Sequence, residues 1–270
     1  MKESFPNFEL DYDTPVDSML QSQLESVDAR LRDAYRMSPS QTAVGLFDAR
    51  TARLAMLRPD TEHYGASVPK IGILLAFFQL RLDETASPDA ATKHELGLMI
   101  KASSNEMAAK FSRLLGLKQI QQVLDSYHLY DAQRGGGIWV GKHYGEDGGE
   151  RIGSPAGGNS HGSTVRQLLR FYLLLEQDRL VSPAACARMR EIFASPDIPH
   201  DDIKFVKGLK GREVSLLRKW GSWEEWLHDS AIMTGPGRHY VLAALTHHSR
   251  GDDYLAALAA AVDDLITLTA

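Results

Sequence analysis

The stretch Gly65-Ala66-Ser67-Val68-Pro69-Lys70 leads directly into the apolar run Ile71-Gly72-Ile73-Leu74-Leu75-Ala76-Phe77-Phe78. Such a run is typical of a buried helix, and a serine three residues before a lysine at its start places hydroxyl and amine one turn apart on one face. A free lysine has a pKa of about 10.4, so the amine becomes a base only where burial and cationic neighbours lower that pKa. The spacing predicts Ser67 as a nucleophile and Lys70 as its general base, although serine is also a common helix cap.

Length and composition exclude several classes of function. The chain has 270 residues, 43% hydrophobic and 24% charged, which suits a two-lobed globular enzyme. A net charge of −5 without a long basic run argues against a nucleic-acid partner. The apolar run after Lys70 is much shorter than the ~20 residues that span a bilayer, so no membrane partner is expected.

The cysteine and histidine content predicts no metal and no cofactor. Cys186 is the single cysteine, which excludes an internal disulfide, and no Cys/His cluster has zinc spacing. The N-terminal segment carries acids and a proline where a signal peptide has a basic start and an apolar core. As written, the chain predicts a cytoplasmic protein, or a periplasmic or secreted one if a leader has been removed. The sequence gives no indication of the oligomeric state.

Hydrophobic periodicity predicts a mixed fold. Residues 14–37 repeat apolar side chains at helical spacing, with Thr14 as the expected N-cap. Residues 41–48 and 54–57 alternate like a hairpin, and three strands are expected at 213–223, 226–234 and 240–247 before a closing helix. Several helical patterns occupy the middle of the chain.

This order of elements predicts an α/β protein of the α+β type. Its antiparallel sheet is built from both chain ends and flanked by helices, and an all-helical lobe is inserted between them. We place the sheet lobe at 1–60 and 201–270 and the helical lobe at 61–200. The cleft between the lobes is the expected site.

A glycine-rich segment interrupts the helical patterns at residues 135–162. It holds eleven of the 22 glycines and few aliphatic residues, which predicts a long irregular loop. Loops of this length tend to border binding sites, with disorder as the alternative. His161 is expected to cap the helix that follows; a catalytic role is the less favoured alternative, because Ser–Lys chemistry needs no histidine.

Two later segments of the sequence form a set of three motifs with Ser67-Val68-Pro69-Lys70. They are Ser103-Ser104-Asn105, a short polar segment between two helical patterns, and Lys219-Trp220-Gly221 in an expected strand. Together the three resemble, in order, the S-x-x-K, S-D-N and K-T-G elements of the penicillin-recognising serine enzymes, and most of all class A β-lactamases. The second element has serine in the middle position and the third has tryptophan in place of threonine. The surrounding elements agree over most of the chain.

The resemblance implies a role for each residue in acyl transfer. Ser67 attacks a carbonyl while Lys70 takes its proton, and the amides of Ser67 and Ser222 form the oxyanion hole. Ser103 relays a proton to the leaving nitrogen, and Lys219 adds positive charge that favours a neutral Lys70 and attracts a substrate carboxylate. Asn105, Trp220, Gly221 and Ser222 are assigned to substrate binding.

One departure from class A β-lactamases concerns deacylation. Those enzymes carry a glutamate, in an E-x-x-L-N context, that activates the deacylating water, and no such context occurs between Tyr130 and Ser163. Glu146 and Glu150 are interpreted as solvated loop charges. Trp220 adds bulk and removes a hydroxyl beside the cleft.

The sequence therefore predicts a β-lactamase-like serine hydrolase. It acts on a small-molecule amide or ester, through an acyl-enzyme on Ser67 that clears slowly. One alternative is a true but weak class A β-lactamase with an unexpected deacylating base. The other is a catalytically retired scaffold that binds a ligand or partner through a tryptophan-lined cleft.

Overall fold

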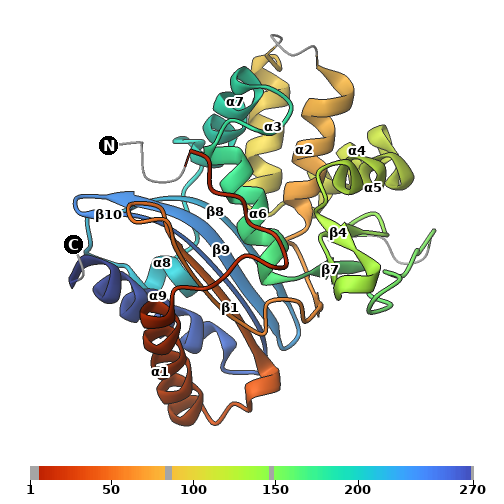
Figure 1. Cartoon of the computed structure of the whole chain (residues 1–270). Helices are drawn as coiled ribbons and strands as arrows, with labels where there is room; N and C mark the ends of the chain where they lie inside the picture. Colours follow the sequence, from red (N-terminus) through yellow and green to blue (C-terminus); the bar gives the residue numbers. More distant parts are fainter. Residues whose placement is uncertain (1–5, 83–86, 146–148, 269–270) are drawn as a thin grey trace.

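The computed structural model describes residues 6–82, 87–145 and 149–268 (Figure 1). Its centre is a five-stranded antiparallel sheet with the strand order β2-β1-β10-β9-β8. The strands are β1 (Thr42–Asp48), β2 (Arg53–Leu57), β8 (Ser215–Trp223), β9 (Trp226–Gly235) and β10 (Arg238–His247). Strands from both chain ends thus share one sheet, which confirms the predicted fold class.

Both faces of the sheet are covered by helices, which explains why β1 is buried along its whole length. Val44 and Leu46 face the core formed with α1 (Ser18–Tyr35) and α9 (Gly251–Leu268). Their neighbours Ala43 and Phe47 point to the opposite core, where α6 (Val165–Glu176) packs on β1 and β10. Helix α1 begins after Asp17, whose carboxylate accepts from Leu20 N, so the expectation of Thr14 as N-cap was wrong.

The helices of the middle region pack around α2 (Lys70–Arg81), which is buried on all sides over its first nine residues. An apolar helix of this kind can only be an interior one. Around it pack α3 (Ala90–Ile100), α4 (Asn105–Leu115), α5 (Leu117–Ser126) and α7 (Pro183–Ala194). The short α8 (Lys204–Gly208) packs instead on α9 and β9. In Figure 1, α2 to α5 and α7 lie on one side of the sheet, away from α1 and α9.

The middle region also contains short strands, so the prediction of an all-helical lobe was incomplete. β7 (His161–Ser163) pairs with both β3 (His63–Tyr64) and β6 (Trp139–Val140), while β4 (Tyr130–Asp131) pairs with β5 (Gly136–Gly137). Two 3₁₀ turns complete the structure, η1 (Pro39–Gln41) and η2 (Ala132–Arg134).

Glu62 ties the glycine-rich segment to the chain just before Ser67. Its half-buried carboxylate accepts from Ser154 Oγ at 2.7 Å and from Asn159 Nδ2 at 2.8 Å. Burial raises the pKa of Glu62, and these hydrogen bonds oppose the rise. The segment is therefore fixed against the site region by polar contacts as well as by β7.

Within the described ranges, no helix is both long enough and apolar enough to span a membrane.

Candidate active site

Ser67 lies in the turn between β3 and α2 and directly precedes the helix, which begins at Lys70. The turn is tight. Ala66 has a φ of 48°, a left-handed conformation that is uncommon for a residue with a Cβ. The Tyr144 hydroxyl donates to Ala66 O at 3.0 Å, and Lys70 N donates to Ser67 O at 3.3 Å. The backbone of the candidate nucleophile is thus held by a side chain of the glycine-rich segment and by the helix start.

The Lys70 side chain is fully buried beneath this turn. Its Nζ donates to Ser103 O at 2.5 Å and to Asn105 Oδ1 at 2.8 Å, and it lies 4.6 Å from the centre of the Tyr144 ring. Burial lowers the pKa of Lys70 from 10.5 to about 7, so a large fraction of the amine is unprotonated at neutral pH. Among the described residues, no hydrogen bond joins Lys70 Nζ to Ser67 Oγ.

Ser103 joins the two predicted lysines. Its Oγ accepts from Lys219 Nζ at 2.8 Å and lies 3.4 Å from Lys70 Nζ. Lys219 is fully buried and also donates to Trp220 O at 2.6 Å. Burial holds the pKa of Lys219 well below its usual range, and the charge of Lys70 lowers it further. The two amines therefore disfavour each other's protonation across one serine.

The edge strand β8 passes closely beside Ser67 at Gly221. A Cβ at Gly221 would lie 2.9 Å from Ser67 N and 3.0 Å from Gly65 O, both backbone atoms that cannot move aside easily. Glycine is required here by this close approach. The next residue, Ser222, is exposed, and because β8 is the outer strand of the sheet, alternate amides along it have no partner strand.

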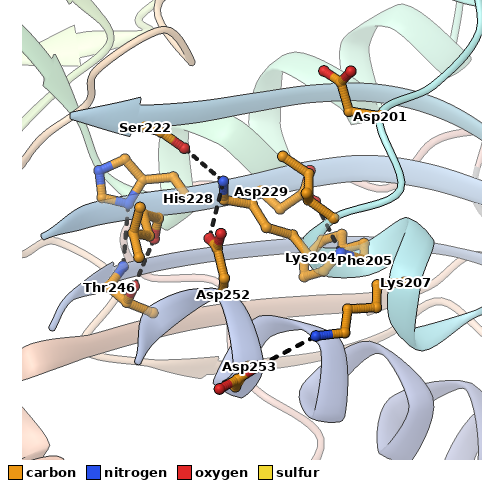
Figure 2. Close-up of polar contacts among 12 residues, drawn as sticks. Asp201, Lys204, Phe205, Lys207, Ser222, His228, Asp229, Thr246, Asp252 and Asp253 are labelled. Atoms are coloured by element: carbon orange, nitrogen blue, oxygen red, sulfur yellow. Dashed lines mark hydrogen bonds and ion pairs between the residues drawn. The ribbon is translucent and has the colours of Figure 1, made fainter. Parts of the chain in front are cut away.

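Lys204 is a third buried lysine at this site, and no sequence motif indicated it. Its Nζ donates to Ser222 Oγ at 2.6 Å and forms an ion pair with Asp252 at 3.0 Å, as Figure 2 shows. It also lies 5.1 Å from the centre of the Trp220 ring, while Lys219 Nζ lies 5.2 Å from the same ring. Trp220 therefore has a lysine amine close to its ring from both Lys204 and Lys219.

A cavity of about 280 Å³ opens over Ser67. Three of the predicted residues line it, namely Ser67, Asn105 and Ser222, together with Trp223, which is 58% exposed. The other predicted site residues do not line the cavity but lie behind it, in contact with the lining through the interactions given above: Lys70, Ser103, Lys219, Trp220 and Gly221. The opposite wall comes from the glycine-rich segment and adjoining residues: Tyr64, Lys142, His143, Tyr144, Gly145, Arg151, Ser160 and His161.

This opposite wall differs from the sequence-based expectation. No lining residue in the described part of the chain is an aspartate or glutamate. Glu150 is exposed and outside the lining, and Glu146 lies outside the described residues.

The expectation that His161 caps the next helix was wrong, because Thr164 caps α6 and His161 lies in β7 at the cavity. Tyr144 was also missed; its only signal was an aromatic residue within a glycine-rich segment.

The described residues contain no group of three or more His, Cys, Asp or Glu side chains that could hold a metal ion.

The sheet built from both chain ends, with an S-x-x-K serine and a buried lysine at a cavity beside its edge strand, defines the class of serine β-lactamase and penicillin-binding proteins. The sequence itself matches the model of the β-lactamase enzyme family over residues 89–267. The chain belongs to this family.

Solved structures show the same fold at low sequence identity. A β-lactamase from Sphaerobacter thermophilus is 15% identical, with a TM-score of 0.72 over 92% of this chain and 98% of that one. A class A β-lactamase from Mycobacterium abscessus is 16% identical, with a TM-score of 0.68 over 92% and 100%. The protein PBP-A is 17% identical, with a TM-score of 0.65 over 89% and 95%. No curated protein matches the sequence.

Proposed function

We propose that this protein is a serine hydrolase that forms an acyl-enzyme on Ser67 with small, β-lactam-like amides or esters. The observation that carries the proposal is the buried Lys70 amine, which lies below the cavity opening at Ser67 and has a pKa of about 7. A fully buried lysine without an ionic partner costs free energy, so its place here favours a chemical role.

Acylation begins when Lys70 takes the Ser67 proton and Oγ attacks the substrate carbonyl carbon. Lys70 Nζ is held by Ser103 O and Asn105 Oδ1 in the free protein. Catalytic hydrogen bonds are often long in free enzymes and shorten when substrate binds, so we expect substrate to draw Lys70 towards Ser67. The amides of Ser67 and Ser222 stabilise the developing oxyanion.

The proton then leaves Lys70 through Ser103 to the departing nitrogen or oxygen. Ser103 Oγ suits this relay because it lies between Lys70 Nζ and Lys219 Nζ. Lys219 donates to Ser103 Oγ and so holds this hydroxyl in place for the relay. Asn105 and the β8 edge at Gly221 and Ser222 hold the substrate beside Ser67.

β-Lactams are the first substrates to test, because the family and the fold are those of β-lactamases. A PBP-A mutant is described as an acyl-enzyme complex with penicillin G. None of the described residues that line the cavity is a carboxylate, which favours an acyl-enzyme that clears slowly.

Intact mass spectrometry after incubation with a fluorescent penicillin tests the proposal. We expect one adduct per chain, located on Ser67 by peptide mapping and absent from Ser67→Ala. A wild-type protein that is folded yet carries no adduct would contradict it. Nitrocefin turnover that is lost in Ser67→Ala would identify the protein as a true, weak β-lactamase. A retired binding scaffold would bind penicillin with no covalent product.

A further inference from the structure

We infer that the imidazole of His161 is the general base that activates water for hydrolysis of the acyl-enzyme. This inference rests on the proposed function, because it requires an acyl group on Ser67. It places the deacylating base in a β-strand on the loop side of the cavity, where class A β-lactamases use a glutamate.

His161 is built into the site. It lines the same cavity as Ser67, and its backbone carbonyl accepts from Gly65 N at 2.8 Å, two residues before the nucleophile. Its ring packs on Tyr144 with the ring centres 4.1 Å apart, and Tyr144 in turn contacts Ala66 and Lys70. The imidazole is therefore fixed in place relative to the Ser67 turn.

The hydrogen bonds of His161 decide which nitrogen can act as a base. Nε2 lies 3.0 Å from Lys142 O, and because a carbonyl oxygen only accepts, Nε2 must carry a hydrogen. In the neutral ring the lone pair is then on Nδ1. Nδ1 lies 3.4 Å from Ser160 Oγ, which is a long and therefore weak hydrogen bond. Ser160 also lines the cavity, so a water molecule in the cavity can take its place as the partner of Nδ1.

The charges around His161 keep the ring neutral. Burial lowers the pKa of His161 to about 4, and the cations Lys70, Lys142 and Arg151 act in the same direction. A neutral imidazole is the form that accepts a proton from water. The same cations make the imidazolium, once formed, a strong donor.

Other groups at the cavity are less suited to this step. Burial raises the pKa of Tyr144 far above 10, so its hydroxyl stays protonated. His143 has Nδ1 bound to Ser112 Oγ at 2.7 Å and is only half-buried.

Hydrolysis of the acyl-enzyme ester takes place in two stages. The water oxygen bonds to the ester carbonyl carbon while one water proton moves to His161 Nδ1. The bond from that carbon to Ser67 Oγ then breaks, and the proton on His161 returns to Oγ. The products are free Ser67, neutral His161 and a carboxylic acid that leaves the cavity and ionises.

The test follows the penicillin adduct by intact mass after free penicillin is removed, in wild type, His161→Gln and His200→Gln. Glutamine retains a donor for Lys142 O but offers no base. We expect His161→Gln to acylate within about threefold of wild type and to clear its adduct about 10²- to 10⁴-fold more slowly, as general-base loss predicts. His200→Gln is the matched control and should clear like wild type, because burial also lowers the pKa of His200 to about 4 but this residue lies outside the cavity lining.

Clearance by His161→Gln at the wild-type rate, or a wild-type adduct that never clears, would overturn the inference while leaving the proposed function intact. A wild-type chain that forms no adduct would contradict both the proposed function and the role of His161. This outcome is seen in the labelling step, before any clearance is measured. If His161→Gln does not fold, the pH dependence of clearance by wild type decides. A histidine base with a pKa of about 4 predicts constant clearance between pH 6 and 8, whereas a rise centred near pH 7 points to Lys70 and contradicts the inference.

Discussion

The two walls of the cavity are built from different chemistry. On one side, behind the lining residues Ser67 and Asn105, the polar wall is a chain of hydrogen-bonded groups formed by Lys70, Ser103 and Lys219. Lys70 lies in α2 and Lys219 in β8, while Ser103 lies in the turn between α3 and α4. On the other side, the ring wall is formed by the packed aromatic rings of Tyr144 and His161, which belong to the glycine-rich segment. The polar wall holds the groups to which we assign acylation, and none of the described residues in the other wall is a carboxylate. The difference suggests that formation and hydrolysis of the acyl-enzyme depend on separate parts of the chain and can be disrupted separately.

The largest expected effect comes from removing the base on the polar wall. Lys70→Met should lower the rate of penicillin labelling of Ser67 by about 10²- to 10⁴-fold, since no other described group lies below the turn to take the proton. The measurement is the labelling rate by gel fluorescence.

Lys101→Met is the matched control for this variant. Lys101 is also buried, but its Nζ donates to Ala194 O and Ser195 O at the end of α7. We expect this variant to lose stability and to label like wild type per folded molecule. Labelling of Lys70→Met within tenfold of wild type would show that the polar wall does not contain the base.

A smaller effect is expected where the strand meets the nucleophile. Gly221→Ala places a methyl group against Ser67 N and Gly65 O, so the turn or β8 must shift by a few tenths of an ångström. Misplacement of reacting groups by this order can cost up to about 10²-fold in rate. We expect labelling to slow by about 10- to 100-fold and the melting temperature to fall by several degrees, because overpacking costs about 1–3 kcal/mol. Unchanged labelling would mean that the approach of β8 is not needed for acylation.

The smallest expected effect comes from the ring wall. Tyr144→Phe keeps the ring over Lys70 but removes the hydrogen bond to Ala66 O. Loss of one buried hydrogen bond should lower the free energy of unfolding by about 1 kcal/mol, measured by urea denaturation. Labelling should change by less than about threefold. A fall comparable with that of Lys70→Met would show that the two walls act as one unit.

Much of the fold could be predicted from the sequence because its signals are local. The apolar run after Lys70 and the alternation in β1, β8 and β9 arise from neighbours along the chain, and the predicted strands agree with the observed ones to within a few residues. The start of α1 was misplaced because Thr14 and Asp17 are both good caps, and only the contacts of the folded chain select Asp17. The division into lobes at residues 60 and 200 stays a prediction.

The parts of the site that the sequence did not reveal depend on long-range contacts through irregular backbone. Lys204 meets Ser222 because α8 packs on α9 and β9 in the folded chain, and no spacing along the chain encodes this pair. His161 was assigned to a helix cap because its role depends on pairing between β7 and β3, a strand of two residues that leaves no periodic pattern. The assigned roles of Ser67, Lys70, Ser103, Asn105 and Lys219 remain proposals, now with a geometry that makes them testable.

The pH dependence of Ser67 acylation tests the central claim most directly. Burial lowers the pKa of Lys70, so the base form is scarce at pH 5 and dominant at pH 9. The second-order rate of labelling should therefore rise about tenfold per pH unit below pH 6, bend near pH 7 and remain constant above pH 8. This bend should disappear in Lys70→Met. A wild-type profile that is flat from pH 5 to 8, or that still rises at pH 10 as an ordinary lysine would require, would contradict the claim that a buried, neutral Lys70 activates Ser67.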